Sequence, residues 1–403
     1  MTSPPSRLLG SERDVASAGE LPTSVQSSRA PQRQLQRRLA SLTFAAATIA
    51  ALLCFLNAGE SGTALADPAA LRVAKTTAAK ASPVSATVRV TATGDIAFGS
   101  TPGLPPDGGR SMFAHVARFL DADVVLGNLE TVLAEGSGAG TKCAGRTACF
   151  SFRAPPQYAR LLSGAGFTAL NLANNHSYDL GPAGLAQTVA ALRRARLSST
   201  GRPGEIAVQN VGPVRVAIVG FAPHPGAQDL RDIPAARMLV RRAAMLADLV
   251  VVTMHAGAEG SDAAHVRPGV ETYEGENRGD VVAFSHAVVD AGADLVLGHG
   301  PHVLRAMEWY RGRLIAYSLG NFSSYRNFNT NGSGGVSAVL RMTLRSDGGW
   351  VRGDLVPVRL VGDGTPVRDQ ARTALGVVRR LSQEDFGRRG ARVDARGDLT
   401  AAR

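Results

Sequence analysis

Short apolar runs rich in β-branched residues alternate with amphipathic stretches over much of this chain. The runs are typical of buried strands, and the stretches between them place apolar residues at helical spacing. Strands are predicted at residues 88–93, 124–126, 169–172, 214–220, 249–253, 295–298 and 314–318, and helices at 181–196, 235–246 and 281–291. Strands that alternate with helices indicate an α/β domain.

The pattern changes after Arg313. Two predicted strands, 335–345 and 353–361, follow one another without a helix between them, which indicates an antiparallel extension of the domain. Residues 368–386 carry apolar side chains at positions 375, 378 and 381, and we expect them to form a closing helix. The tail beyond this helix is expected to be frayed.

Residues 39–59 form an uncharged run rich in Ala, Leu, Ile and Phe, directly after Arg37 and Arg38. About 20 apolar residues with arginine on one flank suffice to span a bilayer with the basic flank inside. Two interpretations stay open. A retained signal anchor would leave the domain outside the bacterial cell membrane, whereas cleavage of a signal peptide after Ala66 would release a secreted protein.

The chain therefore divides into five expected segments. These are a basic cytoplasmic leader at 1–38, the apolar segment at 39–59, a linker at 60–87, a folded domain at 88–362, and a C-terminal helix and tail at 363–403. The formal net charge is +11, but most of the excess lies in the first and last segments, and aromatic residues make up 5% of the chain. The composition thus argues against a nucleic-acid partner.

Three cysteines fit an exported protein. Cys54 lies inside the apolar run, whereas Cys143 and Cys149 lie in a glycine-rich loop with no second cysteine pair to complete a zinc cage. In an oxidising compartment, a disulfide between Cys143 and Cys149 is the expected outcome.

Polar residues that can bind metal or move protons follow the ends of six predicted strands. In α/β sheets, ligands bind beyond the carboxyl ends of the strands. The residues are Asp95, Asn128, Glu130, Asn175, His176, Asp179, His255, Glu259, His299, His302 and Asn321. Because such residues follow all six strands, we predict a single surface lined by carboxylate, imidazole and carboxamide groups.

Most of these residues also have a structural interpretation when taken alone. The alternatives are an ordinary turn residue for Asp95, a helix N-terminal acid for Glu130, a cap for Asn175, and a structural histidine for His176 and for His255. The strongest local signal is the turn from His299 to His302, because it presents two imidazoles at the rim of a sheet, where a metal can bind.

Several segments together resemble the motif series of the CapA-type poly-γ-glutamate capsule biosynthesis proteins, in the same order and over residues 88–322. They are Gly94-Asp95-Ile96, Gly127-Asn128-Leu129-Glu130, Asn174-Asn175-His176 with Asp179, His255 to Glu259, Gly292 to Val303, and Tyr317 to Phe322. The resemblance implies a four-layer αββα sandwich similar to the calcineurin-like metallophosphoesterases. It also implies a membrane-anchored protein that takes part in making or exporting poly-γ-glutamate.

The resemblance assigns roles residue by residue. It implies metal ligands at Asp95, Glu130, Asn175, His255, His299 and His302, and a proton donor to the leaving group at His176. Asp179 lies three residues after His176 and is expected to orient its ring. Asn128, Glu259, Arg305 and Asn321 are expected to face the substrate, and Arg305 is the nearest cation that could meet a carboxylate or phosphate.

The motifs depart from the phosphoesterase pattern in three places. Asp95-Ile96-Ala97 lacks the histidine of an Asp-x-His motif, Glu130 replaces a Gly-Asp segment, and the last turn has one imidazole fewer. One or two divalent ions are therefore both compatible with the sequence. The donor types suit Mn, Fe or Zn.

Three hypotheses follow for the function. The first is an exported protein that assists the synthesis, export or attachment of poly-γ-glutamate or a related polymer, with the polymer, the membrane and a membrane-bound synthase or exporter as partners. The second is an active metal-dependent hydrolase of phosphoesters or of polymer or cell-wall amides. The third is a non-catalytic envelope scaffold.

Overall fold

The computed structural model describes residues 86–136 and 150–400 of the 403-residue chain. Several predicted features lie outside the described residues and stay predictions. They are the leader 1–38, the apolar segment 39–59, cleavage after Ala66, and the Cys143–Cys149 disulfide. Within the part of the chain that the structure describes, no helix has both the length and the apolar character needed to cross a bilayer.

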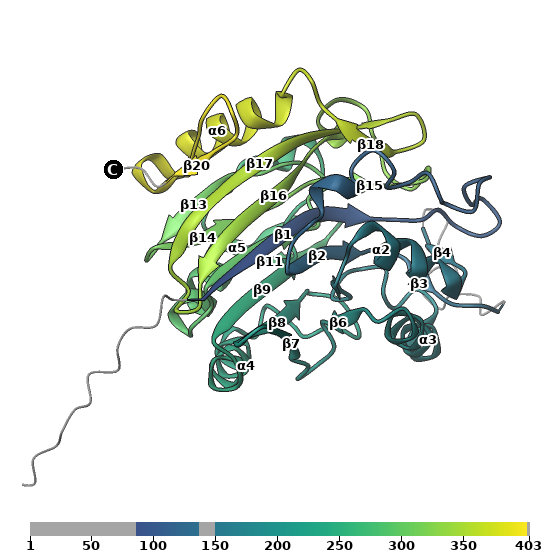
Figure 1. Ribbon diagram of the computed structural model, residues 1–403, viewed down its shortest axis with the longest axis horizontal. Coiled ribbons are helices and arrows are strands. Elements are labelled where there is room, and N and C mark those ends of the chain that lie inside the picture. Colours follow the sequence, from purple (N-terminus) through teal and green to yellow (C-terminus); the bar gives the residue numbers. More distant parts are fainter. Residues whose placement is uncertain (1–85, 137–149, 401–403) are drawn as a thin grey trace, which may run out of the picture. The chain divides into compact units, whose positions relative to one another are not determined.

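Two β-sheets form the centre of the described unit (Figure 1). The first has eight strands in the order β18-β17-β16-β1-β2-β5-β6, with β15 paired to β1. The second has six strands in the order β13-β14-β12-β9-β8-β7. In the first sheet, β1, β2, β5 and β6 are parallel, and β16, β17 and β18 continue it in antiparallel register. In the second sheet, the central strands β14, β12, β9 and β8 are parallel, and β13 and β7 pair antiparallel at the edges.

The bounds of the elements are as follows. The first sheet contains β1 (Thr87–Ile96), β2 (Val124–Leu129), β5 (Ala169–Asn171), β6 (Ser198–Thr200), β15 (Asn321–Ser323), β16 (Val336–Arg345), β17 (Trp350–Val361) and β18 (Thr365–Arg368). The second contains β7 (Ala207–Val211), β8 (Val214–Phe221), β9 (Leu249–His255), β12 (Leu295–His299), β13 (Met307–Tyr310) and β14 (Arg313–Ala316). Three small pairs are β3 (Val132–Leu133) with β4 (Arg153–Ala154), β10 (Glu271–Tyr273) with β11 (Glu276–Gly279), and β19 (Arg392–Val393) with β20 (Leu399–Thr400). The α-helices are α2 (Ala159–Ala165), α3 (Gly181–Arg194), α4 (Ile233–Leu246), α5 (Val281–Asp290) and α6 (Thr373–Phe386).

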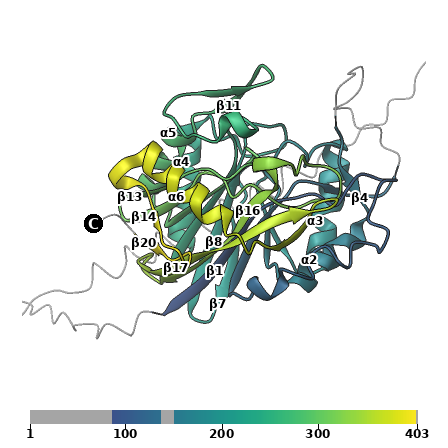
Figure 2. The same ribbon diagram turned by 90° about the horizontal axis from the view of Figure 1, so that it is seen from above.

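Alternation along the central strands sends neighbouring side chains into different apolar layers. Val251 of β9 lies in the core between the two sheets, whereas Val250 packs with residues of α4 and α5. In β2, Val124 faces the same inter-sheet core and Val125 packs with residues of α2 and α3. Helices therefore cover the outer face of each sheet, as Figure 2 shows for α2 and α3 on one side and α4 and α5 on the other. The α/β prediction is confirmed.

All seven predicted strands and the three predicted helices are present, with ends within a few residues of the expected bounds. The antiparallel extension also forms, because β16 pairs with both β1 and β17 in antiparallel register. The closing helix begins later than predicted, at Thr373. The preceding residues Thr365–Arg368 instead pair with β17 as β18, and Asp369 then accepts hydrogen bonds from the backbone of Ala371 and Thr373.

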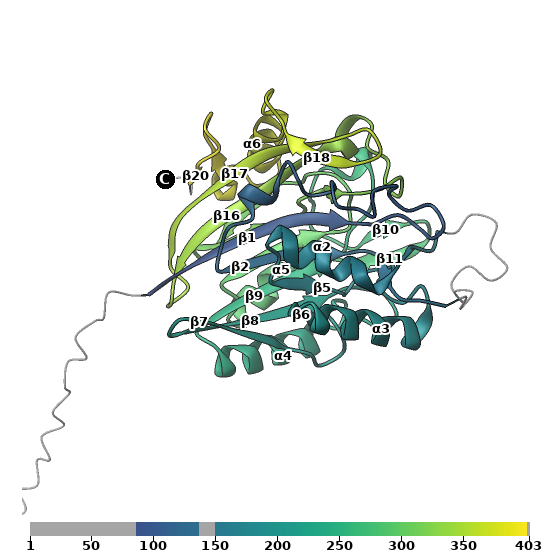
Figure 3. The same ribbon diagram turned by 45° about the vertical axis from the view of Figure 1, so that its right-hand side comes forward.

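The expectation of a frayed tail is wrong for residues 387–400. Strands β19 and β20 pair with each other, and Ala391, Val393 and Leu399 are buried in the inter-sheet core. The Trp309 indole donates a hydrogen bond to the carbonyl of Thr400. Figure 3 shows α6 and β20 beside β17, so the C-terminal segment closes one edge of the sandwich.

We predict that Leu399→Ala lowers the free energy of unfolding by about 2 to 5 kcal/mol, because a buried leucine is lost from the core. Chemical denaturation measures the change. Leu246→Ala is the matched control, since Leu246 is 43% exposed, against 2% for Leu399. Equal stabilities of the two variants would show that the tail is dispensable.

Candidate metal centre

Four parallel strands deliver the central residues of the site at their carboxyl ends. In the first sheet, Asp95 of β1 lies beside Asn128 of β2, and Glu130 follows β2 directly. In the second sheet, His255 ends β9 and lies beside His299, which ends β12. Each pair is adjacent because parallel strands in register bring the same ends together. The site therefore forms where the carboxyl edges of the two sheets meet.

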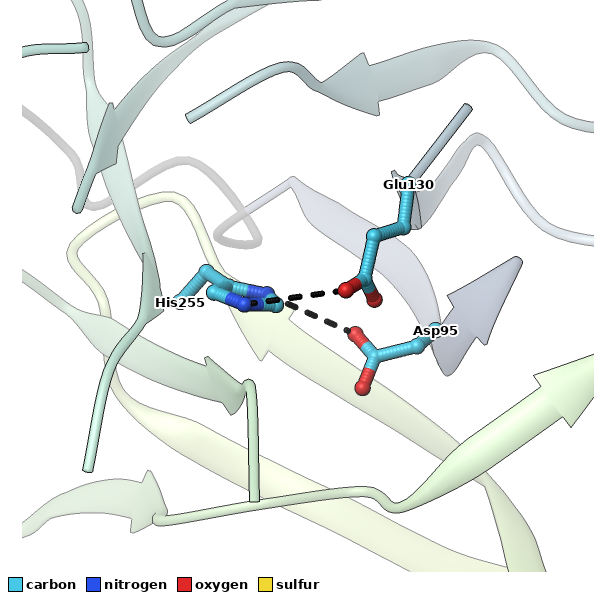
Figure 4. Close-up of side chains that lie close together, drawn as sticks. All are labelled: Asp95, Glu130 and His255. Atoms are coloured by element: carbon cyan, nitrogen blue, oxygen red, sulfur yellow. Dashed lines mark ion pairs between the residues drawn. The ribbon is translucent and has the colours of Figure 1, made fainter. Parts of the chain in front are cut away.

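Asp95, Glu130 and His255 point toward one another (Figure 4). Each offers one ligand atom, and these atoms all lie within 4.8 Å of one another. His255 Nδ1 is 3.9 Å from Asp95 Oδ1, and His255 Nε2 is 3.9 Å from Glu130 Oε1. All three side chains are fully buried. The separations exceed hydrogen-bond length, which suits donors that share a cation.

Two more imidazoles surround the carboxylates. His299 Nδ1 lies 3.6 Å from Asp95 Oδ1, and His302 lies 3.2 Å from Asp95 and 3.6 Å from Glu130. The turn between them depends on Gly300, which has a φ of 108° and whose added Cβ would lie 2.9 Å from the backbone nitrogen of Ala256. A side chain at this position would be strained and would collide with the neighbouring strand end.

The buried nitrogens of the site test whether a metal ion fits. Within residues 86–136 and 150–400, His255 Nε2 and both ring nitrogens of His299 are buried and have no hydrogen-bond partner. Such unsatisfied nitrogens are costly in a protein interior unless they bind something. Together with the carboxylates of Asp95 and Glu130, they form the mixed nitrogen and oxygen donor set that Mn, Fe and Zn accept. The residues fit a metal ion.

The pKa values divide the imidazoles into two kinds. Burial lowers the pKa of His299 to about 4, and Asp95 offsets this only in part. Burial, together with nearby positive groups, also holds the pKa of His255 well below its usual value. For His302 burial acts in the same direction, but Glu130, Asp95 and Glu259 outweigh it and raise the pKa to about 10. Neutral His255 and His299 can therefore offer lone pairs to a metal ion. The positive charge of His302 instead compensates the negative charges of Asp95 and Glu130.

Asn128 holds the two sides of the centre together. Its Nδ2 donates a 2.8 Å hydrogen bond to Asp95 Oδ1 and lies 3.1 Å from His255 Nδ1. Its Oδ1 accepts from Asn171 and Asn174 at 2.9 and 3.1 Å. Asn171 was not singled out in the sequence, where an asparagine at the end of a strand has no distinctive signal.

His176 lies at the side of the cluster and is held from two directions. Its Nδ1 is 2.7 Å from Asp179 Oδ2, which also accepts the backbone N–H of Phe152. The Phe152 ring stacks on the imidazole, with 3.8 Å between ring centroids. His176 Nε2 faces Glu130 Oε1 at 3.9 Å. The geometry agrees with the expected orienting contact from Asp179, whereas no feature of the sequence indicates the Phe152 contact.

A cavity of about 1030 Å³ adjoins the cluster. Glu130, Asn175, His176, Glu259 and His302 are among its lining residues. The rest of the wall comes from the β10–β11 hairpin, the segment around residues 327–334, and the side chains of Phe152, Tyr178 and His224. The cavity gives a ligand direct access to the candidate metal centre.

Arg278 is the arginine that lines this cavity in the described part of the chain. It pairs with Glu259 at 2.8 Å and Glu276 at 3.2 Å, and its guanidinium lies over the Tyr273 ring. Glu259 also lies 3.7 Å from His302. The sequence analysis did not single out Arg278, since it lies outside the strand-end motifs.

Arg305 and Asn321 both contact neighbouring protein groups, and their expected contact with a substrate stays a prediction. Arg305 is fully buried, pairs with both carboxylate oxygens of Glu271, and is not among the described residues that line the cavity. Asn321 accepts from His302 Nδ1 at 2.9 Å and donates to the His302 carbonyl. Arg305 thus fixes the base of the hairpin, and Asn321 fixes His302, which has a φ of 59°.

Fold and site together define an α/β protein with a buried carboxylate and imidazole centre at the open end of two sheets. The chain belongs to the family of bacterial capsule synthesis proteins described as PGA_cap, whose model matches residues 89–326. A capsule biosynthesis protein CapA of Bacillus anthracis is 32% identical over 63% of this chain and 62% of its own length. A PGA biosynthesis protein CapA of Bacillus subtilis is 27% identical over 56% of this chain and 60% of its own.

The chain thus spans about three fifths of the length of these relatives. Among solved structures, a 5′-nucleotidase precursor of Thermus thermophilus has a TM-score of 0.38 and 15% identity, covering 74% of this chain and 59% of its own. A purple acid phosphatase of yellow lupin has a TM-score of 0.35 and 11% identity, covering 72% and 55%. At these scores both are distant likenesses.

We predict that Asp95→Asn and Glu130→Gln each weaken divalent-metal binding at least about 100-fold, because loss of an outer partner alone already costs 10- to 100-fold. Titration calorimetry and elemental analysis after reconstitution with Mn, Fe or Zn measure the effect. Glu276→Gln is the matched control, because Glu276 lines the outer cavity and is exposed. Equal affinities for all three variants would contradict the assignment.

We also predict that Arg305→Met lowers the free energy of unfolding by about 3 to 5 kcal/mol, because it leaves the Glu271 carboxylate without its guanidinium partner. Adding Glu271→Gln should restore much of the loss, since a neutral amide can still accept the Ala258 N–H. Denaturation curves of both variants provide the measurement. An unchanged stability with weaker polymer binding would instead make Arg305 a substrate contact.

Proposed function

We propose that this protein assists the synthesis, export or attachment of poly-γ-glutamate or a related envelope polymer through a divalent-metal centre. Family membership supports the polymer, since curated relatives are named as capsule or PGA biosynthesis proteins. A relative in Mycobacterium tuberculosis is likewise named a probable polyglutamine synthesis accessory protein. The partners are then the anionic polymer and a membrane-bound synthase or exporter.

One observation carries the metal-centred part of the proposal. The carboxyl ends of both sheets bring Asp95, Glu130 and His255 within 4.8 Å of one another at a cavity. In this proposal these three residues hold one or two ions, with Asn175 and His299 in the ligand set. His302 completes it by giving up its proton to solvent, as the ion takes over the compensation of the Asp95 and Glu130 charges. The bound ion would supply Lewis acidity toward a phosphoryl or carbonyl oxygen. A metallophosphoesterase-like four-layer fold is proposed with it, supported by helices on the outer faces of both sheets.

His176 is the proposed proton donor. Asp179 accepts from Nδ1 at 2.7 Å, so in the imidazolium form the proton to be transferred lies on Nε2, on the side that faces Glu130, and its release leaves the neutral imidazole. The stacked Phe152 ring restricts rotation of the imidazole. A histidine held in this way can protonate a departing group as a general acid.

The second candidate function is an active hydrolase of phosphoesters or of polymer or cell-wall amides, and the His176–Asp179 pair favours it. The third, a non-catalytic envelope scaffold, requires neither the metal nor the proton donor. All three place the domain outside the cell, with residues 39–59 as a retained anchor or a cleaved signal. Metal content separates the scaffold from the other two functions.

We predict that His176→Ala leaves metal content and the fold intact, with some loss of stability because Asp179 loses its imidazole partner, yet abolishes polymer production or lowers hydrolysis about 100-fold or more, as loss of a general acid would. Asp95→Ala should lose both metal and function. His115→Ala serves as the matched control, because His115 is exposed and lies outside the site. Complementation of a strain lacking the gene, with elemental analysis of each purified variant, gives the readout.

Two outcomes would change the proposal. If His176→Ala supports polymer production as well as the parent and Asp95→Ala does not, the centre binds metal for structure or recognition, and the enzymatic interpretation fails. If both variants perform as the parent, the metal centre has no part in the function.

A further inference from the structure

Four of the seven large apolar side chains that are exposed in the described part of the chain lie on the α4 side of the second sheet. Three of them belong to α4: Met238 (64%), Met245 (76%) and Leu246 (43%). A fourth, Val208 of β7, is cross-strand partner to Ala217, which packs with the α4 residues. Val208 therefore lies on the same side of the second sheet as α4. An exposed apolar cluster of this kind marks an interaction surface.

Helix α4 is anchored by its opposite face, so this exposure is not a sign of loose packing. Ala236, Leu239, Val240 and Ala243 are buried against the second sheet. Asp232 caps the first turn by accepting the N–H of Ala235. The helix is thus fixed in orientation, and its outer stripe is presented permanently to the surroundings.

Arginines flank this stripe on both sides. Met238 and Met245 are two turns apart and therefore lie on one line along the helix. Arg241 lies to one side of that line and Arg242 to the other, with Arg237 further around. In the described part of the chain, no carboxylate forms an ion pair with these arginines, and Arg242 donates only to the carbonyl of Gly204.

The other exposed helices lack this combination. Arg193 and Arg194 of α3 are exposed without a large apolar neighbour on the helix surface, and Arg380 of α6 pairs with Glu384. An apolar centre with basic flanks is the pattern of helices that lie in a membrane interface, where arginines extend to the headgroups and apolar side chains enter the acyl boundary. Unpaired positive charge on the rim selects an anionic surface.

The topology places the C-terminal end of this face, with Met245 and Leu246, at the end of the domain where β1 begins. Strands β1 and β9 both deliver site residues at their carboxyl ends, so Thr87 and Leu249, which start them, lie at the opposite end. Leu246 ends α4 just before β9 begins (Figure 1). The predicted membrane segment 39–59 precedes β1 in the chain. A tether there would raise the local concentration of the face at the bilayer, so that a modest intrinsic affinity is sufficient.

We propose that the outer face of α4, formed by Met238, Met245 and Leu246 with Arg237, Arg241 and Arg242, docks the domain on an anionic lipid surface. Docking through these residues leaves the cavity open, because none of them lines it. The inference is independent of the chemistry of the metal centre, because it uses none of its residues.

The test uses the full chain reconstituted with bilayers of phosphatidylcholine alone or of phosphatidylcholine with phosphatidylglycerol. A trace lipid with a photoactivatable headgroup reports contacts, which peptide mass spectrometry then locates. Cross-links should concentrate on 233–246 in the anionic bilayer. Arg241→Gln with Arg242→Gln should lower the ratio of docked to undocked protein about 30-fold, from about 1 kcal/mol for each arginine.

Two further variants complete the design. Met238→Gln with Met245→Gln should reduce the same cross-links, while the matched control Arg193→Gln with Arg194→Gln removes equal charge from α3 and should leave them unchanged. All three variants should have the melting temperature of the parent protein, because every changed side chain is exposed. Cross-links that spread evenly over the domain, that fall equally in the control, or that join α4 to a second protein chain would overturn the proposal.

Discussion

Two carboxylates buried side by side are the constraint on which the site and its surroundings depend. Asp95 and Glu130 are both fully excluded from solvent, and an isolated buried carboxylate costs several kcal/mol. The protein offsets this cost with a hydrogen bond from Asn128 to Asp95 and with the positive charge of His302 beside both carboxylates. An arrangement that holds negative charge in an apolar interior has a strong affinity for cations, which is the physical basis of the proposed metal centre.

That constraint also explains why two sheets are needed. One sheet supplies the carboxylates from β1 and the end of β2, and the other supplies imidazoles from β9 and β12. The inter-sheet core, with residues such as Val124 and Val251, fixes the distance between these two sets. The packing of the core therefore determines the geometry of the site, because a densely packed interior does not allow one sheet to shift against the other.

The sequence predicted what depends on local pattern and missed what depends on remote partners. Central strands such as β8 and β9 were found because both faces are buried, which leaves a continuous apolar run. Short pairs such as β19 and β20 were missed, because two residues carry no period and their stability comes from the core. In the same way, the residues at the strand ends were enough to predict the cluster of the site. The residues next to Arg305 in the sequence do not show that its guanidinium pairs with Glu271, 34 positions away.

The hairpin that walls the cavity combines a fixed base with a free tip. Arg305 clamps Glu271 at the start of β10, and Arg278 ties β11 to Glu259. Between the strands, Glu274 and Gly275 form a two-residue turn with positive φ at both positions, and an added Cβ at Gly275 would meet no atom within 4 Å. The tip can therefore lengthen or change composition during evolution without disturbing the cluster beneath. Related chains could diversify the molecules admitted to the cavity while inheriting the same centre unchanged.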